Sequence, residues 1–251
     1  MAMSSEQHPA IAIQDLRKAF GKQKVLNGIS MQVVQGETVA VIGRSGGGKS
    51  VLLKLLIGLQ MPDSGSIRID DKEMTKVDEK QLTEVRKKTG FLFQQAALYD
   101  SLTVEENVAF PLSRHLQMSV QEQAKRVREL LGEVGMDQDR EKLPSQISGG
   151  MQKRVGLARA LALDPEILLF DEPTAGLDPI TSAEIGKLIV ELKQKRQMSA
   201  VVVTHDVHGA KAYSDRMVLL HQGSIRAEGS FDELAHSNDE VVSQFFRYGL
   251  G

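Results

Sequence analysis

The sequence predicts an α/β fold with a mixed sheet core, an antiparallel β edge and an inserted α-helical subdomain. Three observations support this prediction. The apolar, β-branched run at residues 38–42 indicates a buried strand, and it ends in a glycine-rich loop. The continuous apolar run at 167–170 is typical of a central parallel strand. Between these runs, residues 98–163 follow a helical period, with one apolar stripe at Val120, Ala124, Val127, Leu130, Leu131 and Val134.

The other elements follow from alternation, helical period and turn residues. Strands are expected at residues 11–16, 29–34, 66–69, 90–93 and 200–203. Helices are expected at 51–56, 153–163 and 181–195. Residues 217–251 are expected to add two short strands and two terminal helices. A strand, a helix and a further strand in succession form the βαβ unit of a parallel sheet.

The length favours one domain. The 251 residues contain no internal repeat and no linker, so we expect a single domain over residues 1–251. Its expected parts are a core at 9–93 and 165–230, a helical subdomain at 94–164 and a C-terminal helical tail at 231–251.

The composition excludes several function classes. The net charge is -2 with both signs interspersed, so no basic surface for nucleic acid is expected. The chain has no cysteine, which excludes disulfides and thiolate metal sites. No apolar run approaches the ~20 residues that cross a bilayer, and residues 1–10 lack the pattern of a secretion signal. A role at a membrane would therefore require another protein as the anchor.

The glycine-rich loop at residues 43–50 fits the pattern G-x-x-x-x-G-K-[ST] at every fixed position. A strand, a loop and a helix in this order aim several backbone N–H groups at one point, which suits a phosphate. Lys49 would reach the β and γ phosphates, and the Ser50 hydroxyl would hold Mg²⁺. A plain glycine-rich turn is the alternative. The expected nucleotide contacts here are Gly43, Arg44, Ser45, Gly46, Gly47, Gly48, Lys49, Ser50 and Val51.

Two acids follow the second apolar run. Asp171 and Glu172 lie where the ligands of α/β sheets gather, at the carboxyl end of a strand. Asp171 can organise Mg²⁺ and Glu172 can polarise an attacking water. Alternatively, both acids cap a helix that starts at Pro173.

Three further residues are candidates for the nucleotide site because each lies at the end of an expected strand. His205 could contact the γ-phosphate, Gln94 could bind Mg²⁺ or water, and Phe20 could stack on adenine. Each also has an ordinary interpretation: a structural or surface histidine, a surface glutamine and a core phenylalanine.

A second small-residue turn, at residues 147–152, precedes the helix expected at 153–163. It is a second anion-binding helix N-terminus. Because one nucleotide cannot easily use both termini from one subunit, we expect a head-to-tail pair of chains. In this pair, each second turn would cap the nucleotide held by the partner's phosphate loop.

From Ile11 to about Glu228, the chain resembles the ATP-binding-cassette (ABC) ATPases, which have a P-loop NTPase (RecA-like) core. The matching motifs are Walker A at 43–50, the Q-loop at Gln94, the signature at 148–150, Walker B at 167–172, the D-loop at 175–178, the switch histidine His205 and the aromatic Phe20. One departure is Ile147, where leucine is usual.

The resemblance implies an ATP-sandwich homodimer that uses ATP and Mg²⁺. In this dimer, Glu172 activates water with His205 and Gln94, and Mg²⁺ is held by Ser50, Gln94 and Asp171. Contacts to the partner's ATP are implied for Ser148, Gly149, Gly150 and Asp178.

A narrower resemblance is to the bacterial lipid-transport ATPases that serve MCE-protein complexes. It depends on residues 43–54, with Val51 where most of the family has threonine, and on 93–104, 107–112, 148–151 and 241–246. It implies phospholipid transport through a separate permease and an MCE partner, at the cytoplasmic side of the bacterial inner membrane, without nucleic acid. The alternatives are a soluble ABC ATPase of repair, translation or cofactor assembly, and a GTP switch or small kinase. The last two lack support, because the chain has no Asn-Lys-x-Asp guanine motif and neither class explains the turn at 147–152.

Two surfaces are expected to bind partners. Tyr99, Leu102 and Val104 would form, beside Gln94, a groove for an amphipathic helix of the permease. Alternatively, Leu102 and Val104 simply pack the helical subdomain. In the tail, Val241, Val242, Phe245 and Phe246 form an apolar stripe that would dock either on the chain's own core or on a second ATPase chain.

Overall fold

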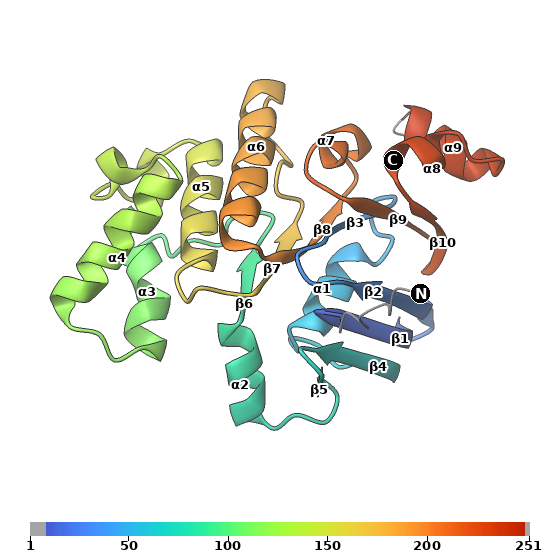
Figure 1. The fold of residues 1–251 in the computed structure, drawn as a ribbon, viewed down its shortest axis with the longest axis horizontal. Helices are drawn as coiled ribbons and strands as arrows, with labels where there is room; N and C mark the ends of the chain where they lie inside the picture. Colours follow the sequence, from blue (N-terminus) through green and yellow to red (C-terminus); the bar gives the residue numbers. More distant parts are fainter. Residues whose placement is uncertain (1–8, 249–251) are drawn as a thin grey trace, which may run out of the picture. The chain divides into compact units, whose positions relative to one another are not determined.

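The protein's structure, a computed structural model, describes residues 9–248, so the expectations for residues 1–8 and 249–251 lie outside the described residues. The chain forms two compact units. Of the described residues, the first unit contains 9–85 and 198–248, and the second contains 86–197. Each unit combines strands with helices, which confirms the expected α/β class (Figure 1). The expected boundaries of the helical subdomain stay a prediction.

The first unit contains an antiparallel sheet with the strand order β2-β1-β4-β5. These strands are β1 (Ile11–Phe20), β2 (Gln23–Val33), β4 (Ser64–Ile69) and β5 (Lys72–Glu73). β1 runs four residues beyond the expected end at 16. The reason is a register shift at Asp15, whose φ of 44° breaks the alternation of buried and exposed residues.

The same unit contains the strand that leads to the glycine-rich loop. β3 (Thr38–Ile42) is fully buried and lies parallel between β8 (Ser199–Thr204) and β9 (Arg216–His221), while β10 (Ser224–Gly229) pairs antiparallel with β9. The sheet is therefore mixed, as expected. The helices α1 (Lys49–Leu56) and α7 (Val207–Lys211) follow β3 and β8. α2 (Glu79–Lys87) was not predicted, because only Val85 of its residues is buried.

The tail folds onto its own chain. α8 (Phe231–Ala235) and α9 (Glu240–Tyr248) lie side by side at the C-terminal end of the first unit (Figure 1). Val242, Phe245 and Phe246 are buried in the chain by itself, whereas Val241 is 42% exposed. Of the two expected docking modes, the one on the chain's own core is confirmed for these three residues. Docking of the same three side chains on a second chain is wrong.

The second unit pairs β6 (Thr89–Leu92) in parallel with β7 (Ile167–Asp171). Its helices are α3 (Val104–His115), α4 (Val120–Glu133), α5 (Gly149–Ala160) and α6 (Pro179–Arg196), with 3-10 turns at Asp137–Asp139 and Pro144–Gln146. Capping boxes begin two of the helices, from Thr103 and Ser119.

Two expectations for these helices need correction. Val120 does not belong to the buried stripe, because it is the first residue after the Ser119 cap and is 83% exposed. α5 begins at Gly149 and not at residue 153, because the Ser148 side chain caps it.

Candidate functional site

The glycine-rich loop of the first unit begins where β3 ends. Gly43 lies so close to the backbone oxygen of Leu220 that any side chain would clash with it. Gly48 has a φ of 94°, and a Cβ atom there would lie 2.9 Å from the Leu26 side chain and 3.0 Å from the Val25 oxygen. The backbone of the loop is thus pressed against β2 and β9, and only glycine fits at these two points.

The loop leads directly into the N-terminus of α1. Gly48 is the N-cap residue, and no side chain of the described part caps this helix start. The ammonium of Lys49 donates to the oxygen of Gly43 over 2.8 Å and to that of Arg44 over 3.1 Å. Lys49 is 6% exposed. A helix N-terminus without a side-chain cap, next to a buried ammonium held inside the loop, has the geometry of a phosphate site.

The other predicted residues of the first unit are accessible to a ligand. Arg44, Ser45 and Gly46 are exposed, whereas Gly47, Ser50 and Val51 are half-buried. Phe20 is 47% exposed at the end of β1, with the Lys18 ammonium 5.5 Å from its ring centroid. The interpretation of Phe20 as a core residue is therefore wrong. His205 is exposed and directly follows β8.

Asp171 and Glu172 lie at the carboxyl end of β7 in the second unit. Both are 8% exposed, and Glu172 has a φ of 48°. The next helix, α6, begins only at Pro179, so these acids do not cap a helix and that alternative is wrong. Two buried carboxylates side by side, one of them on a strained backbone, are typical of a functional site.

Lys153 is the residue of this region that the sequence analysis missed. Its ammonium is buried, donates to the backbone oxygen of Glu172 over 3.0 Å and also contacts the backbone oxygen of Gln94. Burial lowers the pKa of Lys153 to about 8, although the charges of Asp171 and Glu172 oppose this shift. The helical period could have indicated it, because Lys153 lies three residues after Gly150 and four before Leu157, which are both buried.

The signature turn and the D-loop meet within the second unit. The exposed Ser148 accepts a hydrogen bond from the backbone N–H of Met151 over 3.3 Å. A Cβ atom at the buried Gly150 would lie 2.5 Å from Cγ2 of Thr181, and one at Gly149 would lie 3.7 Å from Leu177. Asp178 caps α6 by accepting from the Thr181 hydroxyl over 2.6 Å and from the Thr181 N–H over 3.0 Å. These bonds hold the pKa of Asp178 below its usual value.

A groove of about 480 Å³ lies on the second unit, beside the loop that starts at Gln94. Aromatic pairs form its apolar walls: the ring centroids of Phe91 and Phe93 are 4.1 Å apart, and those of Tyr99 and Phe110 are 4.7 Å apart. Its lining also includes the cationic side chains of Arg86, Lys87 and Arg159 and the imidazole of His115.

The groove corrects part of the expected partner surface. Tyr99 lines it and is 46% exposed, as expected. Val104 is fully buried at the start of α3, so its placement on this surface is wrong and the packing alternative holds. Leu102 is half-buried and does not line the groove.

A family model described as "ABC transporter" matches residues 26–175. The chain belongs to the ABC transporter family. Among its curated relatives, "Probable ribonucleotide transport ATP-binding protein mkl" from Mycobacterium leprae (strain TN) is 41% identical over 94% of this chain and 68% of the relative. "Methionine import ATP-binding protein MetN" from Brucella abortus (strain 2308) is 40% identical over 94% of this chain and 64% of the relative. The chain thus spans about two thirds of the length of these relatives.

Solved structures of ABC cassettes share the fold. The ATP-binding cassette MJ0796, a dimer in a post-hydrolysis state bound to ADP and Pi, is 35% identical, with a TM-score of 0.81 over 88% of this chain and 98% of that one. The cbiO1 protein of Clostridium perfringens, part of the ABC transporter complex cbiONQ, is 29% identical, with a TM-score of 0.83 over 96% of each chain. The expected ABC cassette fold is confirmed. The chain is the ATP-binding subunit of an ABC transporter and an ATPase that uses ATP with Mg²⁺. ABC cassettes dimerise and work with membrane permease subunits.

Each side chain that the sequence analysis predicts to hold Mg²⁺ carries an oxygen donor, and oxygen donors are what this ion prefers. Asp171 offers a buried carboxylate, Ser50 a hydroxyl in the first turn of α1 and Gln94 an exposed amide, all with the oxygen donors that Mg²⁺ prefers. Within residues 9–248, no group of three or more His, Cys, Asp or Glu side chains could hold a metal ion. A bound Mg²⁺ would therefore also need oxygen ligands from phosphate and water. Among the helices of the same residues, none is long and apolar enough to span a membrane.

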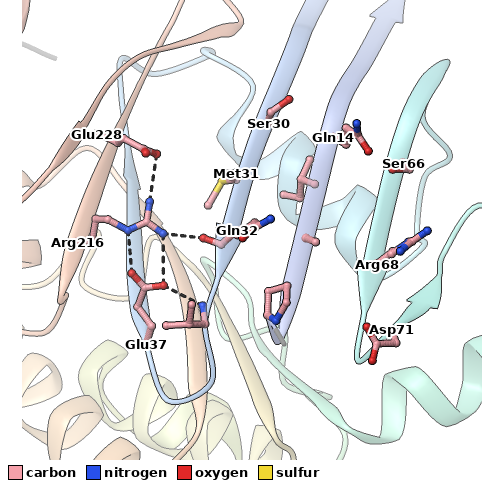
Figure 2. A pocket seen from close by; sticks show the side chains of 14 residues that line it. Gln14, Ser30, Met31, Gln32, Glu37, Ser66, Arg68, Asp71, Arg216 and Glu228 are labelled. Carbon is pink, nitrogen blue, oxygen red and sulfur yellow. Dashed lines mark hydrogen bonds and ion pairs between the residues drawn. The ribbon is translucent and has the colours of Figure 1, made fainter. Parts of the chain in front are cut away.

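A cavity of about 950 Å³ on the first unit lies over the polar face of the antiparallel sheet, and the residues of the glycine-rich loop do not line it (Figure 2). Figure 2 shows Arg216 at its edge, between Glu37 and Glu228. The guanidinium donates to Glu37 over 2.8 and 3.3 Å, to Glu228 over 3.1 Å and to the oxygen of Gln32 over 2.6 Å. These bonds, above all those with Glu37, raise the pKa of Arg216. The cluster joins strands of the first unit, which is a structural role.

Proposed function

We propose that this chain powers phospholipid transport as the ATPase subunit of a membrane complex. It would bind, through a separate permease, at the cytoplasmic side of the bacterial inner membrane, and an MCE-type lipid-binding protein would be attached to the same permease. The single domain with its helical subdomain at 94–164 is part of this proposal.

The position of the residues that resemble the lipid-transport ATPases supports the proposal. Two of these segments, 93–104 and 107–112, supply Phe93, Tyr99, Phe110 and Pro111 to the lining of the groove on the second unit. An apolar groove with cationic lining residues suits an amphipathic helix that carries acidic side chains. The choice of permease depends on such a surface, and the permease in turn decides which cargo the ATPase serves.

Roles for the individual residues follow from their chemistry. Glu172 would accept a proton from the attacking water, with His205 and Gln94 positioning that water at the γ-phosphate. Lys49 and the loop N–H groups of residues 43–51 would bind the phosphates, and Phe20 would stack on adenine. When bound, Mg²⁺ neutralises phosphate charge, and Ser50, Asp171 and Gln94 would hold it.

The dimer would complete each site. In an ATP sandwich, Ser148, Gly149 and Gly150 of one chain would face the γ-phosphate that the partner holds. Asp178 would lie at the same interface, with a carboxylate already fixed by its cap on α6. The small exposed turn at the start of α5 leaves room for a phosphate to approach the helix N-terminus.

The names of the relatives suggest a second candidate, the ATPase of a ribonucleotide transporter or of a methionine importer. Reconstitution separates the two candidates. The chain is purified with its membrane partners and placed in liposomes, and three activities are measured: transfer of a fluorescent phospholipid between vesicles, uptake of methionine and uptake of a ribonucleotide. We expect ATP-dependent lipid transfer that Glu172→Gln abolishes. Methionine or ribonucleotide uptake without lipid transfer would refute the phospholipid assignment, and purification without any membrane protein would favour a soluble ABC ATPase.

A further inference from the structure

Helix α5 carries two long cationic side chains that hold the loop after β6. Lys153, near its start, contacts the backbone oxygen of Gln94. Arg159, near its end, donates to the oxygen of Ala96 over 2.7 Å and to that of Ala97 over 2.8 Å. The loop at 94–97 is therefore fixed to a single helix at three backbone oxygens.

Lys153 also reaches a second loop. The same ammonium that contacts Gln94 donates to the backbone oxygen of Glu172 over 3.0 Å. Lys153 is 4% exposed, so water does not compete freely for its hydrogen bonds. One buried cation thus joins the residue that follows β7 to the loop that follows β6.

The backbone that Lys153 and Arg159 hold is strained. Glu172 has a φ of 48°, and Ala96 and Ala97 have φ values of 56° and 49°. Residues other than glycine rarely adopt such angles, and they keep them only where the surroundings fix them. The hydrogen bonds from Lys153 to Glu172 and from Arg159 to Ala96 and Ala97 are among the contacts that fix these residues.

We propose that Lys153 is a positioning residue of the ATPase reaction, which aims the Glu172 carboxylate and fixes Gln94 relative to it. The proposal rests on the roles proposed above for Glu172 and Gln94. Because α5 starts at the signature turn, with Ser148 as its cap, Lys153 lies one turn from the residues that face the partner's ATP. A shift of α5 when that turn engages phosphate would move Glu172 and Gln94 together.

Charge supports the same assignment. Asp171 and Glu172 place two carboxylates in a buried region, and such a pair is costly without a cation nearby. The lysine thus compensates the charge of the acids while its own hydrogen bonds go to the backbone oxygens of Gln94 and Glu172.

The test compares turnover with nucleotide affinity. Lys153→Met keeps the length and the apolar stem but removes the donor. We expect kcat to fall about 10- to 100-fold, because misplacing a reacting group by about 1 Å has this effect, while the Kd for ATP changes less than about threefold. Lys153→Arg, which restores charge and donors, should recover part of kcat. Lys187→Met, at a residue whose side chain is 79% exposed on α6, is the control for loss of a lysine and should match the wild type.

A double variant shows whether Lys153 acts through Glu172. In the Glu172→Gln background, Lys153→Met should cause no further loss of the residual turnover, because the group that it positions is already absent. If Lys153→Met does not fold, Lys153→Gln takes its place, since it stays polar but is too short to join the backbone oxygens of Gln94 and Glu172. The same fall in kcat is then expected.

Two results would overturn the inference. One is a folded Lys153→Met or Lys153→Gln variant with turnover within about twofold of the wild type, which would make the lysine a structural core residue. The other is an additive loss in the double variant. If Glu172→Gln itself retained wild-type turnover, the proposed role of Glu172 would fail. A fall in kcat of the Lys153 variants carries no information on the cargo. The phospholipid proposal is therefore tested separately, by the lipid-transfer measurement in liposomes.

Discussion

The rings of Phe231 and Phe246 pack edge to face, with centroids 5.9 Å apart and an interplanar angle of 71°. Phe231 opens α8 and Phe246 lies in α9, so this contact joins the two terminal helices. The ammonium of Lys211 lies 4.2 Å from the Phe231 centroid and adds a cation–π contact from α7. The tail is thus part of the first unit's own core.

This packing predicts a loss of stability when Phe246 is truncated. Phe246 is fully buried, so Phe246→Ala should lower the free energy of unfolding by about 3–5 kcal/mol. Val241→Ala, on the 42% exposed side of the same helix, should change it by less than about 0.5 kcal/mol. Urea unfolding measures both, and sedimentation measures the ATP-bound dimer. Weaker dimerisation of Phe246→Ala at unchanged stability would contradict the assignment of the tail to its own core.

Glu133 predicts a pH dependence of stability. Burial alone would raise the pKa of this carboxyl, but hydrogen bonds from Lys195 and Arg196, both 2.8 Å long, lower it below its usual 4.5. A lowered pKa means that the pair stabilises the fold above about pH 4.5 and that this contribution is lost as the pH falls through the lower folded value.

Glu133→Gln should therefore lower the free energy of unfolding at pH 7 by about 1–2 kcal/mol, and the difference from the wild type should shrink below about pH 4. Urea unfolding across this pH range is the measurement. Glu191→Gln removes a 58% exposed partner of Lys187 and should have almost no effect at either pH. A constant difference for Glu133→Gln at all pH values would show that the ion pair is not its cause.

The strand pattern was predictable wherever one face of a strand is buried. The alternation in β1 and the continuous apolar runs of β3 and β7 place these strands directly. The true end of β1 was hidden, because the shift at Asp15 changes which residues face the core. α2 was hidden because it buries a single side chain, so no apolar stripe appears in its sequence.

The candidate site was predictable to the extent that its motifs are local. The phosphate loop and the two acids after β7 are each visible in a few consecutive residues. Lys153 was not visible in this way, because its partners Gln94 and Glu172 are 59 and 19 residues away along the chain. The sequence analysis placed Val104 on a surface because it lies close to Tyr99 in the sequence. Val104 is instead the first residue of α3 after the Thr103 cap, and its side chain is buried.

The groove on the second unit predicts which substitution separates ATP binding from complex assembly. Tyr99→Glu places a carboxylate against the Phe110 ring, which disfavours an apolar partner helix. We expect co-purification with membrane partners to fall about tenfold or more, since about 1.4 kcal/mol of lost binding suffices for that. Nucleotide affinity, measured by calorimetry, should not change. Val120→Glu, an 83% exposed position outside the groove, is the control. Intact co-purification of Tyr99→Glu would place the permease elsewhere.

Two substitutions should separate nucleotide binding from hydrolysis. Glu172→Gln cannot take a proton from water, so turnover should fall about 10²- to 10⁴-fold while ATP still binds. Lys49→Ala removes the buried ammonium of the phosphate loop, so ATP affinity itself should fall. Calorimetry and phosphate release distinguish the two effects, and Glu172→Gln should accumulate as an ATP-bound dimer. Normal turnover in Glu172→Gln, or normal ATP affinity in Lys49→Ala, would refute the corresponding role.

Mixing two inactive variants should show whether Ser148 acts on the partner's ATP. Ser148→Arg blocks the exposed turn that caps α5, and Glu172→Gln removes the proposed base. If Ser148 acts across the dimer, a mixed dimer has one intact site and one site with both defects. If it acts on its own chain's ATP, each site of the mixed dimer has one defect and none is intact.

Equal mixing gives about half mixed dimers, so the first arrangement should restore roughly a quarter of wild-type single-turnover hydrolysis, while each variant alone stays inactive. Single turnover is the appropriate measurement, because it counts intact sites without requiring the second site to open and reload. Mixtures of Ser148→Arg with Lys49→Ala provide a matched control, since Lys49 also belongs to the Walker A side and the same recovery is expected. A mixture that stays as inactive as its components would assign Ser148 to its own chain's nucleotide.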